Sequence, residues 1–233
     1  MKKVGIIIFA SALIIGLVVS NIFSFGRMSD SLFHFSVNFS GEKGSGKIVT
    51  QQRDLKGFKA VEVGGVFLVE ITAQKDFSLE IETDDNLLPL IKTEVNDGVL
   101  TIESEGRLSP TNQIKVRISA PDIDNLDVSG AANLTLNDVK NSSLSVEASG
   151  ASKLKLAGET TRLTVDVSGA SKLDAEDLKA SKADVEASGA SRIDVNVSEA
   201  LSVDASGASN IVYSGTPSSL HKKTSGASHV SQK

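Results

Sequence analysis

The chain contains no cysteine, which excludes disulfide bonds, thiol chemistry and a lipidated leader cysteine. It has no tryptophan, one tyrosine and nine phenylalanines among its 233 residues. Five of the phenylalanines lie before position 36, at Phe9, Phe23, Phe25, Phe33 and Phe35. A core in the remainder must therefore be built mainly from Ala, Val, Leu and Ile, which suits thin stacked layers better than a thick globular interior.

A strong charge of either sign is also missing, because the formal net charge is only −5. Residues 1–50 carry five Lys and Arg against two Asp and Glu, a net of +3. Residues 51–120 carry eight against twelve, and residues 121–233 carry eleven against fifteen, a net of −4 in each part. An acidic body behind a basic leader argues against a nucleic acid partner.

The leader has the pattern of an export signal. Lys2 and Lys3 are followed by a mostly apolar run over residues 4–25, so residues 1–25 are predicted to be a signal peptide or an N-terminal membrane anchor. Val18-Val19-Ser20 fits a cleavage site, but the run is also long enough to span a hydrocarbon core of about 30 Å. The two lysines favour a cytoplasmic N-terminus. We therefore expect the remainder to be exported, either membrane-anchored and facing the periplasm or exterior, or secreted to the cell surface.

Gly, Ser and Asn are frequent in residues 26–52, which are predicted to be a flexible linker. Within them, the stretch Gly41 to Lys47 fits the pattern GxxxxGK. The next residue is Ile48, where a phosphate-binding loop needs Ser or Thr for Mg²⁺. We therefore interpret the stretch as a spacer and expect no nucleotide or other cofactor.

An internal repeat dominates the second half of the chain. SGAA begins at Ser129, and SGAS begins at Ser149, Ser168, Ser188, Ser206 and Ser225, at spacings of 20, 19, 20, 18 and 19 residues. Apolar residues stand five, three and one positions before each of the middle motifs, and apolar alternation resumes five and seven positions after the motif. This period of two predicts a strand, a corner, a second strand and a variable return loop in each unit.

A unit of about 19 residues is too short to bury its own apolar face, but in-register stacking buries it and pairs the backbone groups. The pattern therefore predicts an all-β fold, a parallel β-helix or β-solenoid with 18–20-residue rungs about 4.8 Å apart. Right-handed winding is favoured by the general crossover preference. The domain is predicted over residues 53–233, with degenerate rungs in 53–125 and regular rungs in 126–233.

The corner motif has physical requirements of its own. Glycine can adopt the positive φ that a sharp corner needs, which predicts a structural role for Gly130, Gly150, Gly169, Gly189, Gly207 and Gly226. The alanine after each glycine is expected to point inward. The serines are expected to form hydroxyl ladders along the stack.

In the degenerate part, strands are predicted around Gly64-Gly65 and over residues 77–81, 99–102 and 114–118. Residues 86–93 are the one predicted helical turn.

Two charged columns are predicted on the outside of the stack. Two positions before each corner Ser stand Asp127, Glu147, Asp166, Glu186 and Asp204, and then Lys223. Four positions after it stand Asn133, Lys153, Lys172, Arg192, Asn210 and His229. Like charges at layer spacing repel by about 1 kcal/mol in water. Two interpretations stay open: solvent and the basic column relieve this repulsion, or divalent cations or a basic ligand bind along the acidic column.

No other metal or catalytic site is predicted. His34 falls in the linker, and His221 and His229 are expected to be exposed polar residues of the final rung. The serines include no GxSxG motif, and no histidine is placed to activate one. We therefore expect a protein that is not an enzyme.

The segments GFKAVEVGGVFLVEIT and DDNLLPLIKTEVNDGVLTIE, followed by the SGAS rungs, resemble the GIN-type adhesin head domain family over about residues 55–230. This resemblance implies a parallel β-helix and a role in cell-surface adhesion. We expect a surface ligand that is a glycan or a protein, and the leader predicts contact with the membrane through the N-terminal segment. One alternative is a self-assembling envelope scaffold similar to bactofilins, so homo-oligomerisation is left open. The remote alternative is a polysaccharide-cleaving β-helix enzyme, which needs wider rungs and a groove.

Overall fold

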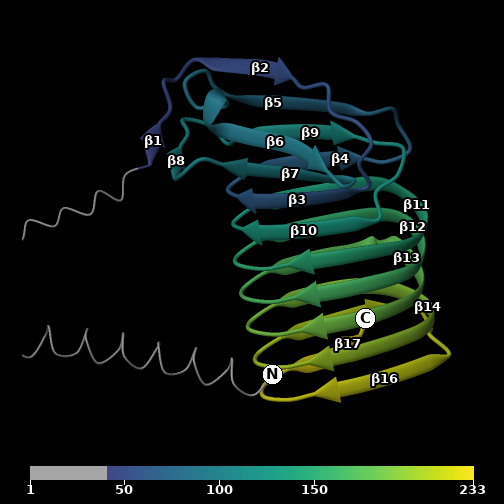
Figure 1. Ribbon diagram of the computed structural model, residues 1–233. Coiled ribbons are helices and arrows are strands. Elements are labelled where there is room, and N and C mark those ends of the chain that lie inside the picture. The colour runs from purple at the N-terminus through teal and green to yellow at the C-terminus, as the bar shows by residue number, and fades with distance from the viewer. Residues whose placement is uncertain (1–40) are drawn as a thin grey trace, which may run out of the picture. The chain divides into compact units, whose positions relative to one another are not determined.

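The regular rungs are long strands that bend round a narrow core and lie one above another (Figure 1). A computed structural model describes residues 41–233 of the chain, which form a solenoid of about five turns. The rungs comprise β10 (Asn125–Gly130), β11 (Asn133–Ala148), β12 (Lys153–Val167), β13 (Lys172–Ala187), β14 (Arg192–Ala205), β15 (Asn210–Ser214), β16 (Ser219–Thr224) and β17 (His229–Gln232). Each of β11 to β14 runs through both halves of a turn, so the expected return loop is part of a continuous strand.

Two faces of the solenoid meet at the Ser-Gly-Ala corner. We call the sheet before each corner the pre-corner face; it holds β10, the second halves of β11 to β14, and β16. The sheet after each corner is the post-corner face, with the first halves of β11 to β14, β15 and β17. The segments that lead from the post-corner to the pre-corner face form the return side. All these strands pair in parallel and place equivalent residues side by side, for example Val146 beside Val165.

The first turn lies inside the stack rather than at its end. It consists of β3 (Ala60–Gly65) and β4 (Leu68–Thr72). β3 pairs with β10 on one side and with β7 (Val99–Ser104) on the other, and β4 likewise pairs with β11 and with β9 (Lys115–Ser119). The chain therefore adds one turn on one side of β3–β4 before it continues on the other side.

Antiparallel strands close this end of the solenoid (Figure 1). β5 (Ser78–Asp84) pairs with β9, β2 (Ile48–Gln52) pairs with β5, and β6 (Ile91–Asn96) pairs with β7, all antiparallel. The two-residue strands β1 (Glu42–Lys43) and β8 (Leu108–Ser109) pair beside them. Because the antiparallel strands interrupt the parallel stacking, they act as a cap on the layers below.

Two expectations change in this cap. The prediction of a flexible linker over residues 26–52 is wrong from residue 41 onward, because β2 is held by five residue pairs with β5. The predicted helical turn over residues 86–93 is reduced to the 3₁₀ turn η1 (Leu88–Leu90), and Ile91 already begins strand β6. The strands predicted around Gly64-Gly65 and near residues 77, 99 and 114 are confirmed as β3, β4, β5, β7 and β9.

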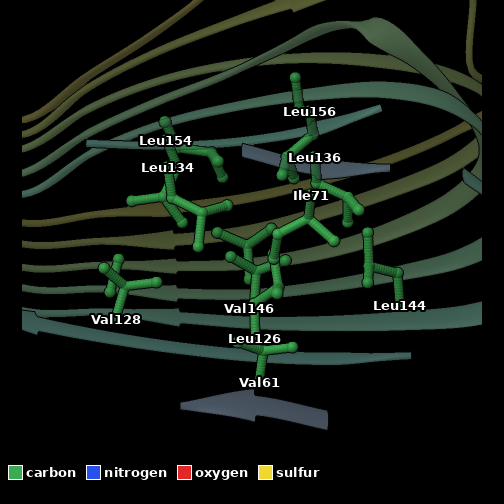
Figure 2. Packing of buried hydrophobic residues seen from close by; sticks show 14 of the residues in the cluster. Val61, Ile71, Leu126, Val128, Leu134, Leu136, Leu144, Val146, Leu154 and Leu156 are labelled. Atoms are coloured by element: carbon green, nitrogen blue, oxygen red, sulfur yellow. The ribbon is translucent and has the colours of Figure 1, made fainter. Parts of the chain in front are cut away.

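The core is a continuous column of aliphatic side chains from successive layers. Figure 2 shows Val61, Leu126 and Val146 stacked along the pre-corner face, with Leu134 and Leu154 on the opposite side. All five are at most 2% exposed. Burial of each such side chain contributes about 1.5–3 kcal/mol. Within residues 41–233, Phe58 and Phe77 pack together near the cap, with their ring centroids 5.0 Å apart.

The all-β solenoid predicted from the repeat is confirmed. The predicted apolar leader at residues 1–25, residues 26–40 of the predicted linker and His34 lie outside the described residues. Within residues 41–233, no helix is long and apolar enough to cross a membrane.

Candidate functional site

The glycine corners are the tightest points of the stack. All six predicted corner glycines have positive φ, between 70° and 87°. A Cβ on Gly169 would lie 2.5 Å from the carbonyl oxygen of Gly150 in the preceding layer. That carbonyl accepts a hydrogen bond of 2.8 Å from the N–H of Ala170. The predicted structural role of the glycines is therefore explained twice, by backbone conformation and by the close approach of layers.

At the middle corners the alanine lies outside, and the second serine of the motif takes the buried position that was expected for the alanine. Ala151 and Ala170 are exposed, whereas the serines that follow, Ser152 and Ser171, are 1–2% exposed. The prediction of inward alanines is wrong, because the strand alternation already begins at the second serine of the motif. The hydroxyl ladder is present as pairs: Ser152 Oγ donates to Ser171 Oγ at 3.1 Å, and the Oγ atoms of Ser191 and Ser209 lie 3.1 Å apart.

The acidic column occupies one line of the pre-corner face. Strand register places the five predicted carboxylates side by side in sequence order, all exposed. Glu62 of β3 extends the line as a sixth member beside Asp127, and Thr101 of β7 follows it. Sequence reasoning missed Glu62 because its rung has Gly64-Gly65 in place of Ser-Gly. That glycine pair was the available signal, since Gly65 aligns with Gly130.

Only the last carboxylate of this acidic column has an ion-pair partner on the described part of the chain. Asp204 accepts a hydrogen bond from Lys223 Nζ at 2.5 Å, which raises the pKa of Lys223. No ion pair crosses the corner to the predicted basic column within residues 41–233. Arg192 instead pairs with Asp194 on its own strand, at 3.2 Å. The predicted relief by the basic column is therefore not made through direct ion pairs, and solvent is what surrounds most of these carboxylates.

The two late histidines lie on different faces. His221 is paired in register with Ser202 on the pre-corner face, and His229 with Asn210 on the post-corner face. Both are exposed. In residues 41–233, no three His, Cys, Asp or Glu side chains are placed to hold a metal ion together.

A buried carboxylate in the cap was not anticipated from the sequence. Asp84, at the end of β5, is 0% exposed. Its Oδ1 accepts from the N–H of Gly46 at 2.7 Å and from the hydroxyl of Thr111 at 2.5 Å, and its Oδ2 accepts from the N–H of Thr111 at 3.0 Å. The bond from the Thr111 hydroxyl is the main cause that lowers the pKa of Asp84, and the two N–H groups lower it further.

This carboxylate also explains the stretch that fits GxxxxGK. The N–H of Gly46 points at Asp84, and the N–H of Ser45 donates to Asn86 Oδ1 at 2.8 Å. Backbone N–H groups of this kind bind phosphate in a nucleotide-binding loop. Here side chains of the cap take those positions, so the loop fastens β1 and β2 to the cap.

The regular rungs also carry a shallow depression of about 540 Å³ on the return side. It arises where the rungs differ in length and their register shifts, between residues 136 and 139, 155 and 158, and 175 and 179. Its lining is polar and has no aromatic ring: Lys140, Asn141, Glu159, Thr160, Thr161, Lys179, Ala180, Ser181, Asn196 and Ser198.

Comparison with protein families identifies the family of the chain. Residues 57–217 match the family described as putative auto-transporter adhesin, head GIN domain. The match covers more than half of the chain. The chain belongs to this GIN head domain family.

Solved structures support the fold of this GIN domain. A putative adhesin from Bacteroides fragilis shares 20% sequence identity, with a TM-score of 0.69, over 83% of this chain and 100% of that chain. A protein from Parabacteroides distasonis named as a putative lipid binding protein shares 18% identity, with a TM-score of 0.50, over 83% and 100% of the two chains. No curated protein matches the chain.

The family match leaves out two parts of the described GIN domain. Strands β1 and β2, which Asp84 fastens to the cap, precede residue 57, and β16 and β17 follow residue 217. Both ends of the stack thus lie outside the matched range, whereas the acidic column lies within it up to Asp204.

A salt comparison tests whether the acidic column of the GIN domain binds metal. We expect CaCl₂ and NaCl at equal ionic strength to raise the unfolding midpoint equally, because the carboxylates are solvated and both salts screen their repulsion. The measurement is thermal unfolding followed by circular dichroism. A larger rise with Ca²⁺ that disappears in the variant Glu147→Gln, Asp166→Asn, Glu186→Gln would contradict this and establish paired-carboxylate binding.

Proposed function

We propose that the chain is an exported, non-catalytic binding module of adhesive type, displayed outside the cytoplasm. The observation that carries the proposal is the pair of long outer faces on a rigid stack. The pre-corner face repeats a carboxylate over six layers, in the acidic column from Glu62 to Asp204, and the post-corner face carries Lys153, Lys172 and Arg192 on three successive layers. Repeated weak contacts along such a face add up to strong attachment to a partner that is itself extended or densely displayed.

The family relation supports the same role, since the GIN head domain is described as part of adhesins. The basic, apolar leader supports export. A glycan or a protein of a cell surface is the proposed ligand, and the N-terminal segment is the proposed membrane contact.

A binding screen with the full-length protein tests this role. We expect saturable binding to at least one member of an array of glycans and cell-surface proteins. Two matched sets of substitutions then assign the face: Glu147→Gln with Asp166→Asn on the pre-corner face, and Lys153→Gln with Lys172→Gln on the post-corner face. Binding should be lost in one set and kept in the other, with unchanged circular dichroism. Absence of binding by the unaltered protein, or binding that survives both sets, contradicts the proposal.

Export has a separate test. A phosphatase that is active only outside the cytoplasm, fused after Lys233, should be active in cells that produce the full chain, because Lys2 and Lys3 hold the N-terminus inside. Replacing both lysines by Glu serves as the control and should reduce this activity. An inactive phosphatase fusion beside an active cytoplasmic reporter at the same position would overturn the export proposal.

A further inference from the structure

The end of the solenoid is more polar than the layers above it, because Thr224 and Gln232 are in register with buried Ala205 and Tyr213, and one further inward position carries a charge. The inward position three residues before the corner serine is held by Leu100, Val61, Leu126, Val146, Val165, Val185 and Val203 in successive layers, each at most 2% exposed. The residue in register with Val203 on β16 is Lys222. A charged side chain thus stands at the inward position where each of the other layers has an aliphatic one.

Lys222 covers the end of the core without entering it. Its Nζ lies 4.8 Å from the centroid of the Tyr213 ring, and Tyr213 on β15 is 5% exposed. The long aliphatic stem of a lysine can lie over an apolar surface while its ammonium group stays in water. The ring face attracts the ammonium group and favours this placement.

Two features of this end would allow another rung to be added. Among residues 41–233, β16 pairs only with β14, and β17 pairs only with β15, so each has one edge without a strand partner. Leu220, in register with buried Leu201, is 42% exposed.

We propose that the free edges of β16 and β17 fit the same edges of a second copy of the chain, and that the charge of Lys222 prevents the two copies from pairing. Stacking of rungs holds all the regular layers together, so the best fit to an open rung is a rung of the same sequence. Adding the last rung of a second copy would take the Lys222 ammonium group out of water and set it against the Lys222 of that copy. Inward-pointing charges at edge strands oppose pairing in this way.

The neighbouring lysine does not have this role. Lys223 points outward on the pre-corner face and pairs with Asp204, so it would remain in solvent if a rung were added. The two adjacent lysines therefore provide a matched pair: the same change at each removes one charge, but only the change at Lys222 frees the end. The inference goes beyond the proposed binding role, and it predicts that the unaltered chain forms no end-to-end scaffold.

Sedimentation velocity on full-length Lys222→Val, Lys223→Val and the unaltered protein, all in the same detergent, tests the proposal. We expect Lys222→Val to dimerise, and we expect the other two to sediment alike as monomers up to at least tenfold above the concentration at which Lys222→Val dimerises. Lys222→Thr, which removes the charge but stays polar, should fall between them and serves if Lys222→Val does not fold. Equal association of the Lys222 and Lys223 variants, a monomeric Lys222→Val that is folded by circular dichroism, or end-to-end dimers of the unaltered protein would each overturn it.

Discussion

Gly169→Val should unfold the solenoid at a markedly lower denaturant concentration than the unaltered chain. Its φ of 75° lies in a region that costs a β-branched residue about 1–3 kcal/mol. The new Cβ would also lie 2.5 Å from the Gly150 carbonyl oxygen, and overpacking of this kind costs a further 1–3 kcal/mol or so. The layer below prevents the rung from moving away, so both terms are expected in full. The measurement is the urea midpoint followed by circular dichroism.

Two other glycines separate the conformational cost of the positive φ from the cost of the close contact between layers. Gly106 has a φ of 72° but no atom within 4 Å of its would-be Cβ, so Gly106→Val should show the conformational cost alone. Gly226 has both the positive φ and the close carbonyl, of Gly207, but no described layer lies below it, so its rung can shift. Gly226→Val should therefore cost less than Gly169→Val. Equal losses at Gly106 and Gly169 would mean that the close approach of the layers is unimportant.

The regular half of the fold could be predicted because it is a repeat. A period of two around a motif that recurs every 18–20 residues determines which side chains are inward, and stacking then determines the register of the acidic column. The corner was predicted only in part. Glycine follows from the sharp turn, but the expectation of inward alanines ignored the alternation that runs back from Leu154 to Ser152. A small hydroxyl side chain is tolerated inside because the next layer supplies its partner.

The cap could not be predicted in the same way. Its strands pair antiparallel and out of sequence order, as β3 does when it lies between β7 and β10, and no local pattern encodes such an arrangement. Residues 41–52 have the composition of a linker and are ordered by partners far away in sequence, as β1 is by residues 108–109 and β2 by residues 80–84. The Asp84 cluster belongs to this class. The sequence around Asp84 does not distinguish it from other aspartates at strand ends, because its partners Gly46 and Thr111 lie on loops distant in sequence.

Asp84→Ala should release the first strands of the cap while the regular rungs stay folded. The substitution removes the buried, ionised acceptor for Gly46 N–H, Thr111 N–H and the Thr111 hydroxyl, and so removes three charge-assisted hydrogen bonds. Amide hydrogen exchange in residues 47–52 should therefore accelerate by about tenfold or more, since a bond to a charged acceptor is worth at least that factor in an opening equilibrium. Exchange in β12 and β13 should be unchanged. The neighbouring Asp85→Ala is the matched control, because the Asp85 carboxylate contacts the same loop at the surface, through Ser45 Oγ and Lys47 Nζ.

The hydrogen bonds accepted by Asp84 also make the stability of the cap depend on pH, and their effect on the pKa of Asp84 gives the direction. The Thr111 hydroxyl, followed by the two N–H groups, lowers the pKa of Asp84 in the folded chain below that of an unfolded carboxyl group. The ionised form thus stabilises the fold, and this contribution is complete above the ordinary aspartate pKa of about 3.9 and is lost as the pH falls through the lower folded value. Exchange of residues 47–52 should accelerate in that acid range in the unaltered chain. In Thr111→Val, which keeps the backbone N–H but removes the hydroxyl, the acceleration should begin at a higher pH. If exchange accelerates at the same pH in the unaltered chain and in Thr111→Val, the hydrogen bond from the Thr111 hydroxyl does not stabilise the cap.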